Sequence, residues 1–355
     1  MTEKAEQSLD PLAIGREVDG APEVVEQPPS RLRRLLGQRE LGIISAAIFL
    51  FIILSLINQE AGVNKFTQTE NLLTIARQIS LVTIMAVGMT YVIISGEIDL
   101  AIGSTFGVSG IALGLLIKDG HDPWFALLAA LALGTSIGLF NGAVSTKFGV
   151  PSFVVTLGML SALRGVALAL AGGWPVAGLP SDRFFAITGG FLVIATDTYT
   201  SIPMQVIWMI VVLLIGWFVL SKTRYGYHLY ATGSNKQAAI LNGIPTDRVK
   251  ILAFMFTGFL AALAASLQLG FFKSFQPTNG QGLELEVIAA VIIGGTNLFG
   301  GSGNILGTLV GAAIIGMITN GLILAGVPTY WQFVAIGLII IFAVVLDVQI
   351  RKRQR

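Results

Sequence analysis

Apolar residues run along most of this chain in long segments, separated by short polar or glycine-rich turns. Because the hydrocarbon core of a bilayer is about 30 Å thick, a helix needs roughly 20 mainly apolar residues to cross it. Ten segments reach or approach this length, which predicts an all-α polytopic membrane protein with about ten transmembrane helices. The segments are residues 42–57, 72–95, 104–117, 123–146, 151–170, 203–221, 249–270, 284–298, 304–325 and 328–347.

Three further stretches lie outside these ten segments. Residues 184–195 are apolar but short and have Gly189 and Gly190 at their centre, so we expect an external re-entrant or surface segment. Residues 1–40 contain prolines and many acidic side chains but no apolar run, which predicts a disordered polar tail in the cytoplasm. Residues 349–355 form a short basic tail.

The basic residues indicate which side of the membrane the two ends occupy. An even number of spans puts both ends on one side, and from Arg31 onward the segments on that side carry fourteen Lys and Arg residues. The opposite side carries Lys65, Lys118, Arg183 and Lys273. Since Lys and Arg are enriched in cytoplasmic loops, we expect both termini in the cytoplasm.

The composition agrees with a membrane protein and excludes several other classes. Charged residues make up 12% of the 355 residues, against about 25% in soluble domains. A formal net charge of +2 does not favour nucleic acid as a partner, and the absence of cysteine excludes disulfides and Cys-ligated metals. With only two histidines, His121 and His228, we expect no metal site.

Glycines and lysines are placed for helix packing rather than for nucleotide binding. No Gly-Lys pair occurs in the chain, so the phosphate-binding loop G-x-x-x-x-G-K-[ST] is absent. Gly134, Gly138 and Gly142 are spaced four apart, which suits close contact between membrane helices. We therefore expect a protein that is not an enzyme and has no cofactor of its own.

Residues 222–248 form the longest segment expected between two spans on the cytoplasmic side. Within it, the sequence NKQAAILNGI predicts a short helix with Asn235 as its N-cap and with Asn242 and Gly243 at its end. Pro245 prevents the helix from continuing. The pattern leaves two interpretations open: a linker lying on the lipid headgroups, or a helix that docks a cytoplasmic partner.

Charged side chains near or within the spans are candidates for a solute path. A charge at the bilayer centre costs about 2.5–3.5 kcal/mol on insertion scales, so such residues usually face a cavity or a partner. Arg164 lies deepest, and a buried, purely structural ion pair with a carboxylate is an alternative there. Glu284 and Glu286 lie at the start of a span. Instead of facing a cavity, their side chains could extend to the membrane interface by snorkelling.

Residues 95–103 interrupt two spans with Glu97, Asp99 and two glycines. Irregular backbone at membrane depth persists only where it is buried in protein or lines a cavity, and broken segments are typical of transport pathways. A turn at the cytoplasmic side is the plainer alternative. Neutral hydrogen-bonding groups in later spans suit a hydroxyl-rich solute or interhelical hydrogen bonds equally. They are Thr296, Asn297 and Asn320.

Five stretches of the sequence carry a resemblance to a known family. They are GMTYVIISGEIDLAIGS (88–104), NGAVSTKFGVPSFVVTLGMLSALRGVALALAGG (141–173), ATGSNKQAAILNGIPTDRVKI (231–251), LELEVIAAVIIGGTNLFGGSGNILGTLVGA (283–312) and NGLILAGVPTYWQFVAIGLIIIFAVVLD (320–347). In this order they resemble the sugar-type permeases of bacterial ABC importers, a group that includes ribose, xylose, rhamnose and autoinducer-2 permeases.

The resemblance implies an inner-membrane permease domain over residues 41–348 and several partners. These are a second permease copy, a cytoplasmic ATPase subunit that holds the ATP and Mg, and a periplasmic or extracellular sugar-binding protein. The resemblance also favours the docking interpretation of residues 222–248. The residues that it implies contact the ATPase are Gly233, Ser234, Asn235, Gln237, Ala238, Asn242 and Gly243.

The sequence also departs from the family pattern. The family usually has S-G-G-I-D-L-S, whereas here Glu97 replaces the second glycine and Ala101 replaces the last serine. The solute therefore stays open.

Two functional hypotheses follow. The first is a permease subunit of an ATP-driven importer for a monosaccharide or related polyol. The second is an ion-coupled secondary transporter, which Glu97, Asp99 and Arg164 would support.

Overall fold

The computed structural model describes residues 38–60, 63–179, 183–193, 201–328 and 330–339, together with Ile341 and Val345. The chain divides into one unit of residues 1–38 and a second of residues 39–355, and the second unit contains the spans. Apart from residues 38–40, the two predicted tails lie outside the described residues.

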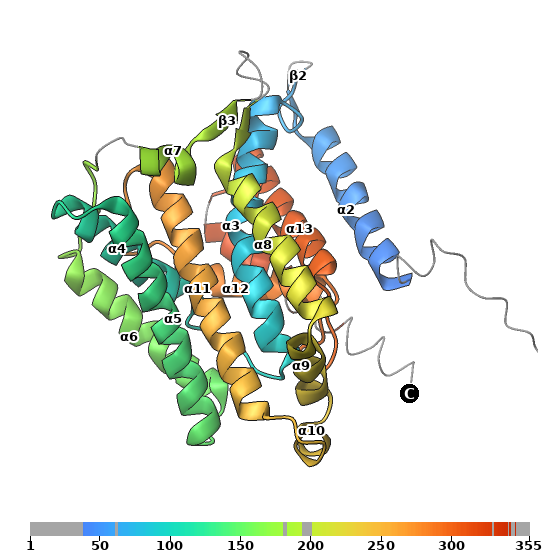
Figure 1. The fold of residues 1–355 in the computed structure, drawn as a ribbon. Coiled ribbons are helices and arrows are strands. Elements are labelled where there is room, and N and C mark those ends of the chain that lie inside the picture. Colours follow the sequence, from blue (N-terminus) through green and yellow to red (C-terminus); the bar gives the residue numbers. More distant parts are fainter. Residues whose placement is uncertain are drawn as a thin grey trace, which may run out of the picture. The chain divides into compact units, whose positions relative to one another are not determined.

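Six helices in the described part of the chain are long and apolar enough to cross a membrane (Figure 1). Each coincides with a predicted span, so the prediction of a mainly helical, multi-pass membrane protein is confirmed. The six helices are α3 (Thr69–Ile94), α5 (Pro123–Lys147), α6 (Ser152–Leu170), α8 (Met204–Lys222), α11 (Thr246–Phe272) and α13 (Ile305–Leu324).

The other predicted spans correspond to helices or parts of helices that are shorter. Three of them are apolar: Leu41–Ile57 within α2 (Gln38–Ile57), α4 (Ile102–Lys118) and the helix Tyr330–Ile339. The prediction of a full span over residues 284–298 was wrong in length, because α12 (Leu283–Ile293) has 11 residues. At 1.5 Å per residue it covers about 16 Å, roughly half of the hydrocarbon core.

The stretch predicted as a surface or re-entrant segment forms a short helix and a strand rather than a span. Helix α7 (Arg183–Gly189) is followed by strand β3 (Phe191–Val193), which pairs antiparallel with β4 (Ser201–Pro203). A second antiparallel pair joins β1 (Gln59–Glu60) and β2 (Val63–Asn64). The prediction of a strictly all-α protein was therefore wrong in this detail. Strands of two or three residues are too short to be detected from the pattern of apolar residues.

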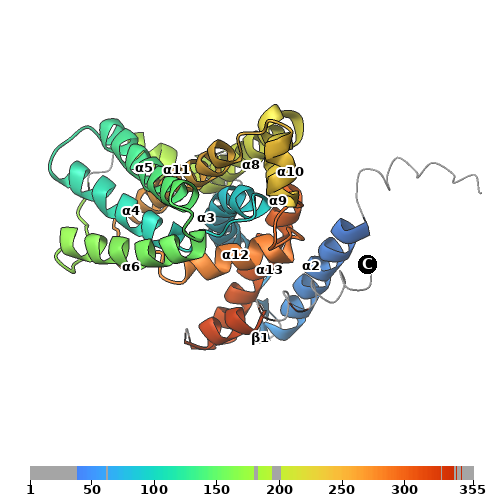
Figure 2. The same cartoon turned by 90° about the horizontal axis from the view of Figure 1, so that it is seen from below.

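Helices α3 and α11 form the centre of the helical unit (Figure 2). Every residue of α3 from Thr83 to Ile94 is buried. The predicted glycine spacing on α5 brings its backbone against α11: a Cβ at Gly138 would lie 2.7 Å from the Phe254 carbonyl carbon. At Gly142 it would lie 2.9 Å from the Ile251 Cα. Residues 134–138 read G-T-S-I-G, but they lie inside α5 rather than at a strand-to-helix turn, so they form no nucleophile elbow.

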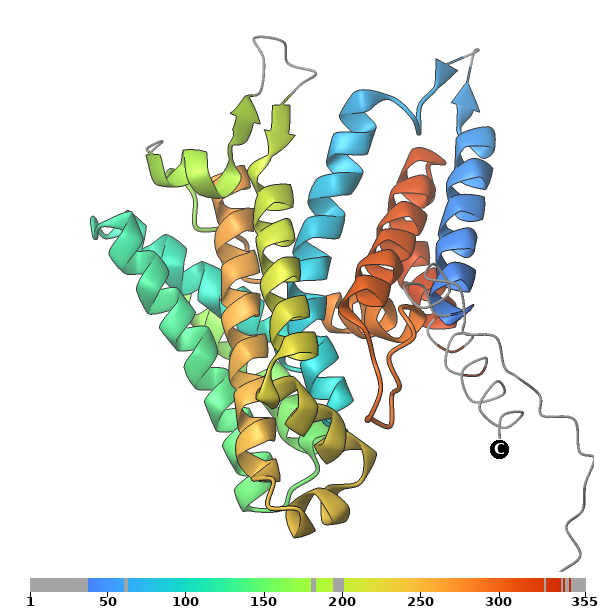
Figure 3. The same cartoon turned by 45° about the vertical axis from the view of Figure 1, so that its right-hand side comes forward.

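Residues 222–248 contain two helices at one end of the spanning bundle (Figure 3). The predicted helix is α10 (Lys236–Leu241), with Asn235 Oδ1 accepting the Ala238 N–H at 3.0 Å as an N-cap. It ends at Gly243, whose φ of 79° is the left-handed conformation that glycine favours. The helix before it, α9 (Arg224–Ser234), was not predicted.

Candidate functional site

The end of α9 rests directly on the backbone of two other segments. At Gly233, a Cβ would overlap the Ile94 carbonyl oxygen at the end of α3 and would lie 2.7 Å from the Gly301 nitrogen. The Gly301 N–H donates to the same Ile94 oxygen at 2.9 Å. The next residue, Ser234, donates its hydroxyl to the Gly301 carbonyl at 3.4 Å. We call this contact among residues 94, 233, 234 and 301 the α9 seat.

Two tyrosines of α9 bind it to further elements. Tyr230 Oη donates to the Gly303 carbonyl at 2.8 Å, and Tyr225 Oη donates to the Val249 carbonyl in α11 at 3.0 Å. The Tyr225 ring stacks on Tyr91 of α3, with centroids 6.2 Å apart. Burial raises the pKa of both α9 phenols, so both stay protonated and remain donors at neutral pH. Helix α9 is thus joined to α3, to α11 and to the turn before α13.

Helix α10 presents an apolar tip beyond this anchored base. Ala239 is buried, whereas Ile240 is 51% exposed and Leu241 is 88% exposed. An exposed ion pair, Lys236 Nζ to Asp247 Oδ1 at 3.4 Å, joins α10 to the start of α11. Of the predicted coupling residues, Gly233 and Ser234 lie in the α9 seat, and the six other than Gly233 are exposed. These six are Ser234, Asn235, Gln237, Ala238, Asn242 and Gly243.

Glu97 forms a nearly buried ion pair with Lys250, in the second turn of α11. The side chains of Lys250 and Glu97 are 10% and 16% exposed. Asp99 is buried, and its Oδ1 accepts the Ala101 N–H at 2.9 Å. The Ile98 N–H donates to Ser152 Oγ at 3.2 Å. The irregular segment between α3 and α4 is therefore tied to both α11 and α6.

Arg164 is held by backbone carbonyls of the segment that leads into α12. Its Nη1 donates to the Pro277 carbonyl at 3.0 Å and to the Asn279 carbonyl at 2.8 Å. Within the described ranges, no carboxylate forms a salt bridge with Arg164. The ion pair offered from the sequence is thus replaced by two hydrogen bonds to a loop that the sequence did not single out.

Glu284 is the predicted path residue that lies near Arg164. The two side chains interact electrostatically, and Glu284 Oε2 is buried without a hydrogen-bond partner. Gly103 and Gly107 of α4 provide the space, since a Cβ at Gly107 would lie 2.9 Å from the Asn279 oxygen and 3.2 Å from Arg164 Nη1. Arg164, Glu284 and these glycines form a polar cluster between α4, α6 and α12.

We expect Arg164→Ala to lower the amount of folded protein, because it leaves the Pro277 and Asn279 carbonyls without donors. A buried unsatisfied polar group costs about 1–3 kcal/mol. The measurement is the monodisperse fraction in detergent gel filtration, with Arg164→Lys as the charge-conserving control. Normal folding of Arg164→Ala together with lost uptake would contradict the structural role and place Arg164 in the solute path.

The remaining predicted path residues are spread over three places. Asn297 shapes the turn before α13, since its Nδ2 donates to the Gly300 carbonyl at 2.6 Å and its Oδ1 accepts the Phe299 N–H at 3.1 Å. Thr296 is buried beside Gly303 with its hydroxyl unpartnered. Glu286 is half-buried in the first turn of α12.

Asn320 takes part in an interhelical contact. It exchanges amide hydrogen bonds with Asn71, at 2.9 and 3.1 Å, which link α13 to α3. Of the two interpretations offered for Asn320, the geometry fits the interhelical hydrogen bond.

The sequence did not predict the hydrogen bonds of Tyr225 and Tyr230 or the ion pair of Lys250 with Glu97. The available signal was the group of tyrosines at 225, 227 and 230, which stands in an otherwise polar loop.

Six helices long enough to cross a membrane, a half-length helix, a polar cluster between helices and a projecting helix pair are typical of a membrane transport protein of the permease class. Residues 71–344 match the family described as "Branched-chain amino acid transport system / permease component". The chain belongs to this family.

Curated relatives agree with this assignment. The chain is 37% identical to the ribose import permease RbsC of Bacillus subtilis, over 87% of this chain and 92% of that protein. It is 38% identical to RbsC of Escherichia coli K12, over 85% and 92%. It is 32% identical to the autoinducer 2 permease LsrC of Salmonella typhi, over 90% and 88%. The resemblance found in the sequence is confirmed, and the chain is a multi-pass inner-membrane permease component of an ABC importer.

A solved structure supports the fold alone. The chain has a TM-score of 0.50 and 14% identity to a chain of an ABC transporter described as being of the metal-chelate type in an inward-facing conformation. The match covers 86% of this chain and 99% of that chain.

Proposed function

We propose that this chain forms the membrane path for a monosaccharide or related polyol in an importer driven by a separate ATPase subunit. The relatives that are named as ribose and autoinducer-2 import permeases support this class of solute. The observation that carries the coupling role is the α9–α10 pair, whose base is hydrogen-bonded to the turn before α13 and to α11 while its tip exposes Ile240 and Leu241. ATP and Mg bind to the partner subunit in this proposal.

The α9 seat gives the coupling a physical route. Movement of the ATPase at α10 displaces α9, and α9 cannot move without the Ile94 end of α3 and the Gly301 turn, because these touch backbone to backbone. Both segments adjoin helices that pack around the path. ATP drives the cycle only if the two states of the complex differ in their affinity for it.

The solute path in this proposal passes the polar cluster of Arg164 and Glu284, together with Glu286 in the same first turn of α12. Helix α6 leaves Gly158 and Gly165 open on its outer face, with nothing within 4 Å of a Cβ at either position. Small residues on such a face allow close approach of another membrane helix. A second permease copy packed there would enclose the path, and an external sugar-binding protein would deliver the solute.

The topology in this proposal keeps ten crossings with both termini in the cytoplasm. Helix α12 and the preceding residues 273–282 together make one crossing, since α12 alone is too short. The α9–α10 pair then lies on the cytoplasmic side, where the ATPase subunit is.

The test is reconstitution of this chain in liposomes with and without its co-purifying ATPase subunit and binding protein. Vanadate-sensitive uptake of a radiolabelled pentose that requires the ATPase would support the proposal. If this chain alone takes up the solute and an uncoupler abolishes that uptake, the proposal is overturned in favour of ion-coupled transport.

We expect Leu241→Asp to weaken binding of the ATPase subunit by at least about ten-fold, which corresponds to about 1.4 kcal/mol. The side chain is almost fully exposed, so the substitution changes the docking surface and leaves the fold intact. The readout is the ATPase retained on immobilised permease in detergent. Phe148→Asp is the matched control, because Phe148 is exposed in the turn after α5. Equal retention by Leu241→Asp and the parent would remove α10 from the interface.

A further inference from the structure

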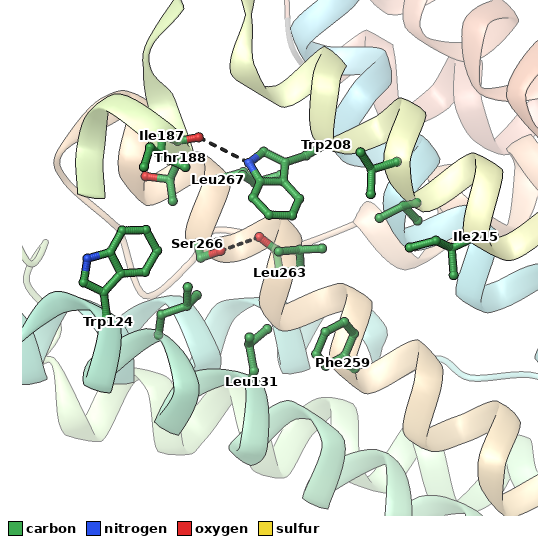
Figure 4. Close-up of a pocket in the computed structure, with 13 residues that line it drawn as sticks. Trp124, Leu131, Ile187, Thr188, Trp208, Ile215, Phe259, Leu263, Ser266 and Leu267 are labelled. Carbon is green, nitrogen blue, oxygen red and sulfur yellow. Dashed lines mark hydrogen bonds between the residues drawn. The ribbon is translucent and has the colours of Figure 1, made fainter. Parts of the chain in front are cut away.

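A cavity of about 290 Å³ lies between α5, α7, α8 and α11. Figure 4 shows Trp124 and Trp208 near one end, Leu131 and Phe259 along the wall, and Ile215 further along α8. Helix α8 packs mainly on α3, whereas α5 packs mainly on α11, so the cavity separates α8 from the α5–α11 pair. Residues Ile187 and Thr188 of α7 complete the wall at one end.

Three of the polar side chains at the cavity already have backbone partners. Ser266 Oγ donates to the Leu263 carbonyl at 2.7 Å, and Thr188 Oγ1 donates to the Phe184 carbonyl at 2.8 Å. The Trp208 Nε1–H donates to the Ile187 carbonyl at 3.2 Å. A bound water needs two to four polar partners, and a hydroxyl-rich solute needs more. The occupant that suits these walls is therefore apolar.

The cavity lies within helices that cross the hydrocarbon core, beside side chains that point outward. Leu128 of α5 and Leu214 of α8 are 66% and 61% exposed, and Ile215, which lines the cavity, is 53% exposed. Lipid chains are thus the medium next to its opening. Trp124 lies at the start of α5, where tryptophan is typical of the membrane interface.

We infer that this cavity binds one acyl chain of a membrane lipid from the leaflet opposite α10. The acyl chain fills the gap between α8 and the α5–α11 pair. If the cavity were empty, the side chains of its walls would lack packing contacts there. Trp124 lies at the end of the cavity nearest the lipid headgroup, and the acyl chain extends from there past Trp208 toward Ile215. Trp208 and Ile215 are seven residues apart, which corresponds to about 10 Å along α8.

Tryptophan quenching by brominated lipid tests this site directly. A single-tryptophan protein keeps Trp208 and carries Phe at positions 124, 174, 217 and 331. It is reconstituted in phosphatidylcholine vesicles with dibrominated or unmodified chains. Ser266→Leu fills the cavity from α11, and Leu214→Phe is the matched control on the lipid-facing side of α8.

We expect brominated chains to quench Trp208 in the parent. Quenching should fall about two-fold or more in Ser266→Leu, because the added methyl groups occupy the cavity, and should stay unchanged in Leu214→Phe. Leu263→Phe, which fills the cavity from the same helix, provides a second variant if Ser266→Leu does not fold. Unquenched Trp208 in the parent, or equal quenching in parent and filled variants, would overturn the inference.

Discussion

Gly233→Ala is expected to reduce ATP-driven uptake by at least about ten-fold, equivalent to about 1.4 kcal/mol. The added Cβ would overlap the Ile94 carbonyl oxygen and approach the Gly301 nitrogen to 2.7 Å. Both neighbours are backbone atoms and cannot rotate away, so α9 must move out of its seat. The measurement is uptake by the reconstituted complex beside its rate of ATP hydrolysis, since a displaced α9 should allow hydrolysis without transport.

Gly42→Ala is the matched control, because nothing lies within 4 Å of a Cβ at this helical position of α2. It should leave uptake unchanged and confirm that an added methyl group is harmless where there is space. Full uptake by a correctly inserted Gly233→Ala protein would show that the α9 seat does not transmit movement. Comparing the amounts of each variant in the membrane separates this result from a failure to insert.

Glu97→Gln is expected to destabilise the folded protein by about 3–5 kcal/mol, because it leaves Lys250 as an uncompensated buried charge. The two side chains are only 10% and 16% exposed, so solvent screens this charge weakly. The pair also joins the segment between α3 and α4 to the start of α11, which follows the α9–α10 pair. Uptake should therefore fall together with the thermal unfolding midpoint of the detergent-solubilised protein.

Two further variants distinguish the ion pair from other roles of Glu97. The double exchange Glu97→Lys with Lys250→Glu should recover part of the lost stability, because it restores opposite charges at the same sites. Lys236→Gln breaks the exposed pair with Asp247, whose side chains are 48% and 55% exposed, and should cost less than about 1 kcal/mol. If Glu97→Gln unfolds at the same temperature as the parent, the pair has no structural role.

The Glu97–Lys250 contact also explains a departure from the family pattern. Glu97 stands where the family usually has glycine, and a lone carboxylate at this depth would be costly. Lys250 provides the compensating charge from a position 153 residues away. Glu97 and Lys250 are therefore expected to function as one unit.

The sequence by itself determined the membrane class, the six long helices and the caps of α10. These depend on local properties: the length of an apolar segment, the N-cap at Asn235 and the left-handed glycine at 243. The spacing of Gly134, Gly138 and Gly142 predicted a close helix contact but not its partner, α11. The assignment to a family rested on long matching segments rather than on any single motif.

Only the tertiary structure decided which distant residues meet. Arg164 binds carbonyls 113 and 115 residues away, and Asn71 binds Asn320 across 249 residues. The seat of α9 on residues 94 and 301 is of the same kind. In a membrane helix the apolar pattern gives length and depth, whereas the partner of a polar group depends on how the helices pack and rotate against one another. The partner of a polar group therefore depends on how complete helix surfaces pack together, and no local stretch of the chain determines it.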